Sequence, residues 1–265
     1  MAKRIKSYPV APGSVYVWRG FKSQTKTWED FAAFLGSIFV PSCALLQPPV
    51  GLRAYVPTMV PQANKPAAVP DQTALMFWDT PQSHDLANGC VAVRAYQNLH
   101  GDLYDMVRSH TPEVPLALPA TAKDFVAEQP YFIFPDEADW MFGKIIHVVG
   151  ARPARIHPAD FLAAVFNWAK QFQQQRPAGA DGALVCAGND YAVAWVYAAK
   201  PGSGFNSVLK SFAALVDVQL DISPRTTPMP AGLWNKWSGF DLTKPAYSSM
   251  NIQLDRPEKT KPVKK

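Results

Sequence analysis

Two stretches of the chain open a helix in the same way. Thr27 to Phe39 read TWEDFAAFLGSIF, and His157 to Ala169 read HPADFLAAVFNWA. In each stretch a capping residue comes first and an acidic residue follows three positions later, at Asp30 and Asp160. Apolar residues then recur every three or four positions, which predicts an amphipathic helix in both places. The repetition indicates that the chain contains two similar halves.

The similarity continues on both sides of these helices. At an offset of 130 positions, SVYVWRGF (14–21) lies over KIIHVVGA (144–151), so that Gly20 corresponds to Gly150. Both runs are rich in β-forming residues and lead through a polar loop into the helix. Each half then continues with two strands and a second helix. The predicted strands are 51–56, 73–79, 182–187 and 191–197, the predicted helices are 82–108 and 203–216, and the candidates for a fourth strand are PLAL (115–118), YFIF (131–134) and VDVQLDI (216–222).

This order of elements predicts the α+β class, with two ferredoxin-like βαββαβ repeats. Each repeat would be an antiparallel sheet with two helices on one face, and pairing the two sheets would bury both uncovered faces. The order, together with MFWDTPQSHDLANG (76–89) and RAYQNLHGDLYD (94–105), resembles the dimeric α+β barrel superfamily, fused as a tandem duplication in one chain. The resemblance covers about 14–223 and implies a pseudo-dimeric α+β barrel. No motif in it is specific to a known activity.

We therefore expect five regions along the chain. The first repeat would occupy 14–135 and the second 136–223. Residues 1–13 and 256–265 would be basic tails, and 224–255 would be a C-terminal extension or a last strand.

The formal net charge of +5 comes from the two ends of the chain. Residues 1–6 and 256–265 hold eight of the 26 basic residues and one of the 21 acidic residues, which leaves 18 basic and 20 acidic residues and a net charge of −2 for the remainder. Nucleic acid would therefore bind only through these tails.

The cysteines and one uncharged stretch bear on location. Cys43, Cys90 and Cys186 are far apart in the sequence, which predicts reduced thiols and a cytoplasmic protein. Residues 31–52 carry no charge over 22 positions but include three prolines, so we expect a helix of the core and no membrane span or membrane partner. The sequence leaves the oligomeric state open.

Four polar residues are candidates for catalysis because of their place in the strand alternation. Alternation puts Arg19 on one face of the first strand and His147 on the matching face of its counterpart, with Asp79 and Tyr197 on the corresponding face of the third strands. His147 could act as a general base, and Arg19 or Tyr197 could stabilise an enolate or phenolate. Two alternatives remain: this face could point to solvent, or Arg19 and Asp79 could pair only with each other.

Other signals for chemistry are weak. His100 falls on the apolar stripe of a predicted helix, where a lone histidine is usually a satisfied core residue, although related barrels sometimes use a helix residue over the pocket. The consecutive Ser83, His84 and Asp85 point about 100° apart on a helix and cannot form a catalytic relay. The sequence contains no phosphate-binding loop and no set of residues with metal-ligand spacing, so we expect no cofactor and no metal.

Three functions remain open at this point. The first is a cofactor-independent enzyme of monooxygenase, lyase, isomerase or cyclase type, acting on a small, largely apolar or aromatic substrate in a pocket between sheet and helices. The second is an RNA-binding subunit, because duplicated ferredoxin-like halves also resemble the RNA-processing subunits of CRISPR systems. The third is an assembly subunit without catalysis, which a filled space between the two halves would favour.

Overall fold

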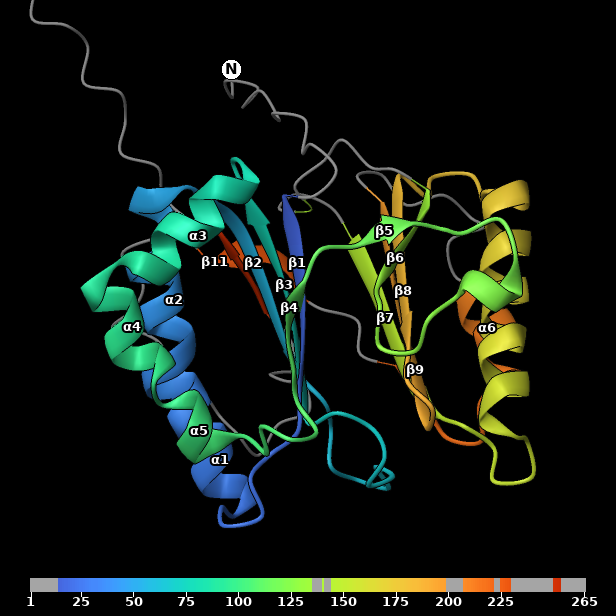
Figure 1. Cartoon of the computed structure of the whole chain (residues 1–265), viewed down its shortest axis with the longest axis horizontal. Coiled ribbons are helices and arrows are strands. Elements are labelled where there is room, and N and C mark those ends of the chain that lie inside the picture. Colours follow the sequence, from blue (N-terminus) through green and yellow to red (C-terminus); the bar gives the residue numbers. More distant parts are fainter. Residues whose placement is uncertain are drawn as a thin grey trace, which may run out of the picture.

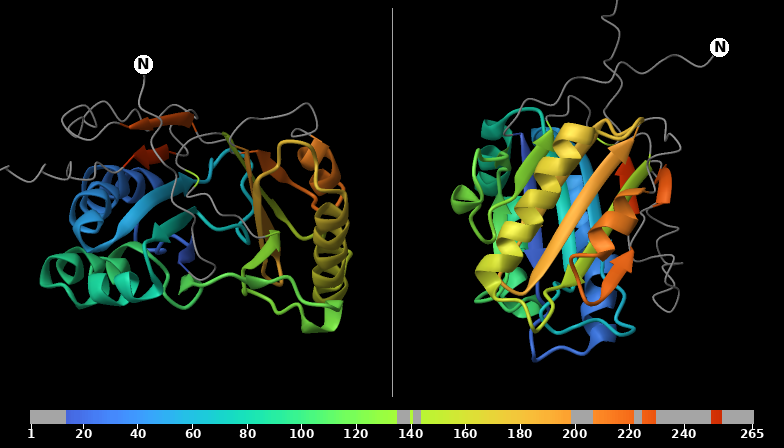
Figure 2. Two further views of the ribbon diagram at one scale, coloured as in Figure 1. Left: turned by 90° about the horizontal axis from the view of Figure 1, so that it is seen from above. Right: turned by 90° about the vertical axis from the view of Figure 1, so that its right-hand side faces the viewer.

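The computed structural model describes residues 14–134, 140, 144–198, 207–221, 225–229 and 250–253. Their helices and strands form four layers of a mixed α+β fold (Figure 1). Two six-stranded sheets face each other in the middle, and helices cover the outer face of each sheet, as Figure 2 also shows.

The first sheet has the strand order β11-β12-β2-β3-β1-β4. Its central strands are antiparallel, and β1 pairs with both β3 and β4. Its strands are β1 (Val15–Gly20), β2 (Leu52–Met59), β3 (Gln72–Trp78), β4 (His110–Glu113), β11 (Arg225–Met229) and β12 (Met250–Gln253).

The second sheet has the strand order β10-β7-β9-β8-β6-β5. The turn at 188–190 joins β8 and β9 into an antiparallel hairpin, as GND in the sequence predicts. Its strands are β5 (Leu116–Ala117), β6 (Tyr131–Phe134), β7 (Lys144–Ala151), β8 (Gly182–Ala187), β9 (Tyr191–Ala198) and β10 (Gln219–Asp221).

The helices divide between the two outer faces. The helices on the first sheet are α1 (Trp28–Phe34), a π-helical segment (Leu35–Phe39), α2 (Val40–Leu46), a 3-10 turn (Pro48–Val50), α3 (Pro81–Gly89), α4 (Val91–Gln97) and α5 (His100–Leu103). The helices on the second sheet are α6 (Pro158–Gln175) and α7 (Ser207–Ala213), with a 3-10 turn at Ala122–Asp124.

Both predicted helix starts have their caps. The hydroxyl of Thr27 accepts a hydrogen bond from the amide of Asp30 at 3.0 Å, and Nδ1 of His157 accepts one from the amide of Ala159 at 3.3 Å. Pro41 predicts an end or a kink near Val40, and the helix does not end there. Instead it widens into the π-helical segment just before Pro41, which accommodates the missing proline N–H, and then continues as α2.

Three predicted elements differ from the structure. The predicted helix 82–108 is three helices. Cys90 adopts an extended backbone (φ −72°, ψ 133°) between α3 and α4, and a turn at 98–99 separates α4 from α5. The fourth strand of the first half is β4, which the sequence does not signal because Pro112 lies inside it. PLAL and YFIF contain β5 and β6, which pair with the second sheet, whereas VDVQLDI contains the predicted fourth strand β10.

The first helical run is unusually apolar. Among the described residues, Trp28–Val50 is the one helix long and apolar enough by composition to cross a membrane, with a mean hydropathy of 1.5 over an 18-residue window. Half of this window is buried inside the fold, where Phe31, Leu35 and Phe39 pack on the first sheet. A core helix of this kind meets the same criterion of length and composition.

Gly20 and Gly150 occupy corresponding places in β1 and β7, and neither place has room for a side chain. A Cβ at Gly20 would lie 2.4 Å from the ring of Tyr104, and a Cβ at Gly150 would lie 2.5 Å from Cγ2 of Val216. In both halves, therefore, the segment after the second helix packs directly on the strand backbone.

We predict that Gly150→Ala lowers the free energy of unfolding by about 1–3 kcal/mol, because the new methyl group would clash with Val216. Gly89→Ala is the matched control, since a Cβ at Gly89 meets nothing within 4 Å. Urea denaturation of both variants measures the difference. Equal stability of the two variants would contradict the close packing at Gly150.

Candidate functional site

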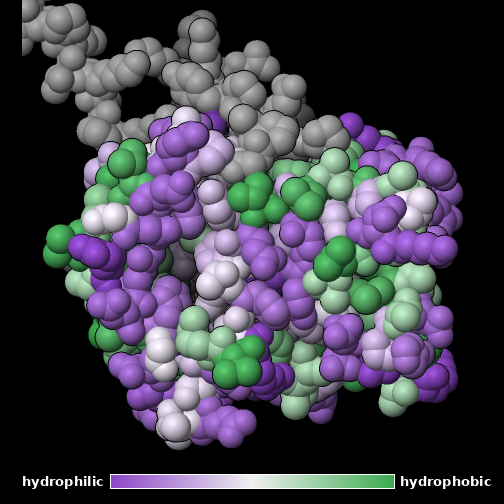
Figure 3. Space-filling view, viewed as in Figure 1, coloured by the Kyte–Doolittle hydropathy of each residue, from purple (hydrophilic) through white to green (hydrophobic). Residues whose placement is uncertain are grey.

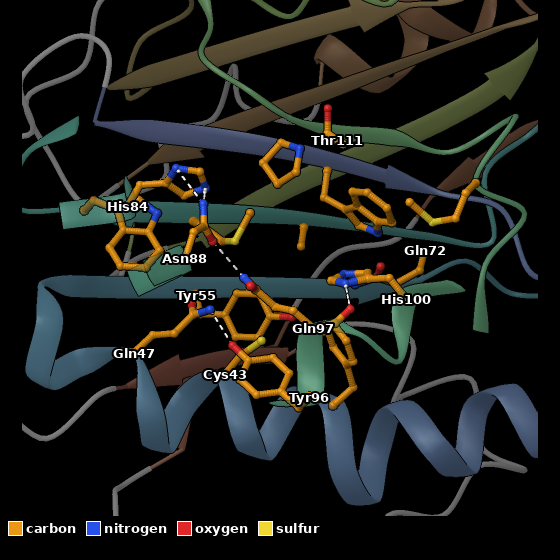
Figure 4. Close-up of a pocket in the computed structure, with 17 residues that line it drawn as sticks. Cys43, Gln47, Tyr55, Gln72, His84, Asn88, Tyr96, Gln97, His100 and Thr111 are labelled. Atoms are coloured by element: carbon orange, nitrogen blue, oxygen red, sulfur yellow. Dashed lines mark hydrogen bonds between the residues drawn. The ribbon is translucent and has the colours of Figure 1, made fainter. Parts of the chain in front are cut away.

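A cavity of about 370 Å³ lies between the outer face of the first sheet and the helices that cover it (Figure 4). Most of its wall is aromatic or apolar, and polar groups occur at a few separate places. The apolar and aromatic lining consists of Trp18, Phe39, Tyr55, Ala74, Met76, Trp78, Tyr96, Met106 and Pro112, and the polar lining of Cys43, Gln47, Gln72, His84, Asn88, Gln97, His100 and Thr111.

The side chains on the outer face of each sheet explain the place of this cavity. The second sheet presents small residues to α6, so the long helix packs closely on it; these residues include Ala183, Ala187, Ala192, Ala194 and Ala198. The first sheet presents large residues, which hold the broken helices α3 to α5 away from the strands; these include Tyr16, Trp18, Tyr55, Met76 and Trp78. Bulky side chains under short helices leave a space that smaller side chains would close.

His100 stands at one end of the cavity among aromatic rings. Its ring centroid lies 4.5 Å from that of Phe39 and 5.2 Å from that of Trp18. Its Nδ1 lies 2.7 Å from the carbonyl oxygen of Gln97. A carbonyl can only accept a hydrogen bond, so Nδ1 carries the proton, and Nε2 of the neutral ring keeps its lone pair.

The electrostatic setting keeps His100 neutral. Burial lowers its pKa below the ordinary value of 6.5, although the hydrogen bond to Gln97 acts in the opposite direction. Nε2 has no hydrogen-bond partner among the described residues. His100 therefore offers an unprotonated nitrogen near neutral pH inside an aromatic cavity.

An amide donor lies at the same end of the cavity. The hydroxyl of Tyr104 donates to Oε1 of Gln72 at 2.9 Å, and the Tyr104 ring lies 5.6 Å from the ring of His100. This bond fixes the Gln72 amide with its nitrogen free to donate, since no described residue accepts from it. A base and a hydrogen-bond donor thus flank one end of the cavity.

The opposite end carries a second histidine in a chain of side-chain contacts, visible at the left of Figure 4. Gln97 donates to Oδ1 of Asn88 at 2.8 Å, and Nδ2 of Asn88 lies 3.3 Å from Nε2 of His84. The His84 ring stacks on Tyr16 with 3.8 Å between centroids. Burial lowers the pKa of His84, and the Asp85 carboxylate raises it in part.

The cavity wall also holds a thiol and two phenols: Cys43 of α2, Tyr96 of α4 and Tyr55 of β2. Burial raises the pKa of Cys43 to about 11, so this cysteine is a neutral thiol and not a nucleophile at pH 7. Burial likewise raises the pKa of Tyr55 and Tyr96 above the ordinary value of 10.0. Nε2 of Gln47 donates to the Tyr96 hydroxyl. These groups can donate hydrogen bonds to a ligand but do not ionise.

The four residues predicted for catalysis do not line this cavity. Arg19 and His147 lie on the inner faces of the two sheets, as the strand alternation predicts, and both are fully buried, so this face does not point to solvent. Asp79 follows β3 and forms an ion pair with Arg53 (3.5 Å), and the Tyr197 ring stacks on Trp140 (5.6 Å between centroids). Arg19 pairs with Glu113 and Glu128, and His147 contacts Thr73 and Trp195, so neither forms an ion pair or hydrogen bond with another of the four. The catalytic role of the four residues stays a prediction.

Arg19 belongs to an ionic network between the two sheets. Its Nη2 lies 3.1 Å from the Glu113 carboxylate, and it also donates to the carbonyl of Glu128. The Glu128 carboxylate in turn contacts His110 and accepts from the hydroxyl of Tyr191. The alternative in which Arg19 pairs only with Asp79 is therefore wrong. Sequence reasoning missed this network because its members are far apart in the chain and converge only when the sheets meet.

Sequence reasoning named His100 but placed it in the core. Two polar residues on the same predicted helix, Asn88 and Gln97, could have indicated a cavity. Polar side chains are costly to bury in an apolar core, so their presence favours a helix face that lines a cavity. His147, by contrast, has the packing of a core residue. It stacks on Trp195 (5.2 Å between centroids, 9° between planes), and its Nε2 lies 3.4 Å from the hydroxyl of Thr73.

Comparisons with known proteins find only distant structural likeness. No protein-family model and no curated protein matches the chain. A "putative monooxygenase" from Lactobacillus acidophilus aligns at 9% identity and a TM-score of 0.34, over 82% of this chain and 92% of that one. An "anthrone oxidase-like protein" aligns at 7% identity and a TM-score of 0.34, over 81% of this chain and 93% of that one. These values assign neither a family nor an activity to the chain.

We predict that His147 makes the fold sensitive to acid. Burial lowers its pKa from 6.5 to about 3, so between these values the unfolded chain binds a proton that the folded chain does not. Its contribution to stability is complete above pH 6.5 and is lost as the pH falls toward 3, at about 1.4 kcal/mol per pH unit.

Urea denaturation of the natural chain and of His147→Val at a series of pH values measures this contribution. The valine variant should lose less stability on acidification, and its stability near pH 7.5 should be close to that of the natural chain. His84, His100 and His110 also have lowered pKa values but titrate in both proteins, so the difference reports His147. Parallel pH profiles would show that folding does not lower the pKa of His147.

Proposed function

We propose that this chain is an enzyme that acts on a small, largely apolar or aromatic substrate in the cavity between the first sheet and its helices. The observation that carries the proposal is His100: a neutral histidine, held in one tautomer by Gln97, inside an aromatic cavity. The cavity volume of about 370 Å³ suits a substrate of one to three rings.

His100 is the proposed general base. Its Nε2 would take a proton from a carbon next to a carbonyl or from a phenolic hydroxyl, and the backbone carbonyl of Gln97 would stabilise the imidazolium that forms. The lowered pKa of His100 favours the unprotonated base near neutral pH.

The Gln72 amide is the proposed partner for the negative oxygen. Proton removal leaves an enolate or phenolate, and a fixed N–H donor in an apolar setting stabilises such an oxygen more than water does. Tyr104 fixes this amide in place before the substrate binds. Proton removal is the step that the monooxygenase, lyase, isomerase and cyclase reactions considered above share, so the proposal does not choose among them. That the reaction needs no cofactor rests on the sequence alone.

Deuterium exchange tests this proposal without knowledge of the natural product. We predict that the natural chain accelerates exchange of the acidic C–H of small aryl ketones in D₂O, followed by NMR. His100→Gln should slow the exchange by about 10²–10⁴-fold, the usual contribution of a general base. Binding of the ketone, measured by quenching of tryptophan fluorescence, should change little.

His147→Val is the matched control, because it removes a fully buried histidine that lies on the inner face and does not line the cavity. It should retain exchange within about 3-fold of the natural chain. If His147→Val lost the exchange activity and His100→Gln retained it, the catalytic site would lie between the two sheets. No exchange by the natural chain with any ketone that binds would contradict the proposal.

We also propose that the chain is a tandem duplication arranged as a pseudo-dimeric α+β barrel, with repeats at 14–135 and 136–223. The order β4-β1-β3-β2 in the first sheet matches β10-β7-β9-β8 in the second. The added strands match too: β12 pairs antiparallel with β2 and parallel with β11, as β6 pairs antiparallel with β8 and parallel with β5. In this arrangement the first repeat contributes β5 and β6 to the second sheet, and the region after the second repeat contributes β11 and β12 to the first sheet.

An assembly subunit without catalysis is the second candidate. The observation in its favour is the filled layer between the two sheets, where large side chains such as Trp195, Phe77 and Tyr197 pack together. This candidate predicts that the helix-side cavity binds no small aromatic molecule. The fluorescence measurement above therefore also decides between the two.

A further inference from the structure

Two buried polar atoms in the wall of the cavity lack a hydrogen-bond partner. Nε1 of Trp78 can only donate and Oε1 of Gln47 can only accept, and neither has a partner among the described residues. Both side chains line the cavity, and their exposed fractions are 1% and 3%. A buried polar group left without a partner costs about 1–3 kcal/mol. An unpaired donor and an unpaired acceptor beside a cavity therefore indicate a ligand that pairs with both.

Contacts place Trp78 and Gln47 at the same end of the cavity. The Trp78 ring lies 5.5 Å from the ring of His84, edge to face. The amide of Leu52 donates to the backbone carbonyl of Gln47 at 3.2 Å, and Leu52 is the partner of Trp78 in the pairing of β2 with β3. Figure 4 shows Gln47 and His84 on one side of the cavity and His100 on the other. The unpaired donor and acceptor thus lie at the end opposite the proposed general base.

Neighbouring polar side chains at this end already have contacts of their own. Nε2 of Gln47 donates to the hydroxyl of Tyr96, which fixes the amide and leaves Oε1 as the unpaired atom. Oδ1 of Asn88 accepts from Gln97 at 2.8 Å, and Nδ2 of Asn88 lies 3.3 Å from Nε2 of His84. These contacts hold the end of the cavity in place before a ligand binds.

The composition of the wall restricts the group that can bind here. Among the described residues that line the cavity, none is a lysine, arginine, aspartate or glutamate. Hydrophilic residues lie instead on the outer surface over the helices of the first sheet, which is mostly purple at the left of Figure 3. A carboxylate or ammonium group of a ligand would have no counter-ion in the cavity and would be costly to bury. A hydroxyl is the smallest neutral group that both accepts and donates.

We propose that this end of the cavity binds a hydroxyl group of the substrate, which accepts a hydrogen bond from Nε1 of Trp78 and donates one to Oε1 of Gln47. This inference rests on the proposed function, in which the reacting end of the substrate meets His100 and Gln72. The substrate class is then an aromatic compound with the reacting carbonyl or phenol at one end and a second hydroxyl at the other. Trp78 and Gln47 determine specificity and take no part in proton transfer.

Calorimetric titration of the natural chain with matched ketones tests the proposal. The one-ring pair is 4-hydroxyacetophenone and acetophenone, and the two-ring pair is 2-acetyl-6-hydroxynaphthalene and 2-acetylnaphthalene. In at least one pair the hydroxylated ketone should bind about 10–100-fold more tightly, because its partner leaves both protein atoms unpaired. Two lengths are used so that one of them spans the cavity from end to end.

Two variants assign this preference to the named atoms. Trp78→Phe removes the donor and keeps an aromatic ring, and Gln47→Leu removes the acceptor. Each should lower the preference for the hydroxylated ketone about 10-fold and should leave the affinity for the other ketone within about 3-fold. Trp195→Phe is the matched control, because Nε1 of Trp195 is also buried and unpaired but lies on the inner face, away from the cavity lining. Its preference should equal that of the natural chain.

Two results would overturn the proposal. The first is a hydroxylated ketone that binds the natural chain no more tightly than its partner in both pairs, which needs no variant to fold. The second is a preference that both folded variants retain and that His100→Gln loses, which would place the hydroxyl at the reacting end. Thermal melting checks that each variant is folded. Titration does not depend on turnover, so a preference without deuterium exchange would support the hydroxyl site and contradict the proposed catalysis, and exchange without a preference would do the reverse.

Discussion

The two sheets pack face to face through a continuous layer of apolar side chains, and the position of every other element follows from that contact. Val15, Val17 and Leu75 of the first sheet meet Val149, Leu184 and Trp195 of the second. At roughly 25 cal/mol per Å² of apolar surface buried, a layer of this size is among the largest stabilising contributions in the fold. Because the inner faces are used in this way, helices must cover the outer faces, and a small-molecule cavity can form there without opening the contact between the sheets.

The outer faces then differ in one physical property, the size of the strand residues. Alanines on the second sheet let the long helix α6 pack closely, with Phe161 and Phe166 filling the interface. Trp18, Tyr55 and Trp78 on the first sheet keep the helices at a distance, and Cys90 breaks the second helical run into short pieces. The cavity, and with it the polar residues His100 and Gln72, exists only because the two halves are unequal in this respect.

Much of the fold could be predicted from the sequence because its signals are local. The caps at Thr27 and His157, the alternation in β1 and β7, and the turn at 188–190 each depend on a few neighbouring residues. The edge strands could not be predicted in the same way. β4 contains a proline, and β6 has the pattern of a fourth strand in its own half but pairs with β8 of the other, a choice that depends on where the sheets meet.

The site was harder to predict for a related reason. Strand alternation correctly places Arg19 and His147 on the inner faces, but it does not reveal whether an inner face holds a cavity or a packed layer. Arg19 finds Glu113 and Glu128, and His147 finds Trp195, so the polarity of these residues serves the contact between the sheets. The size of the residues on the outer face of the first sheet indicates where the cavity lies, and the polarity of the residues on its inner face does not.

The ring nitrogens of His100 report directly whether this residue is the neutral base that we propose for the cavity. Long-range proton–nitrogen NMR spectra of the chain with isotope-labelled histidine distinguish the protonated nitrogen from the free one in each ring. At pH 7 we expect a neutral His100 with the proton on Nδ1. Its Nε2 signal should shift when a small phenol is added, and the His147 signals should not move. A charged His100, a proton on its Nε2, or a response to the phenol by His147 alone would contradict the proposal.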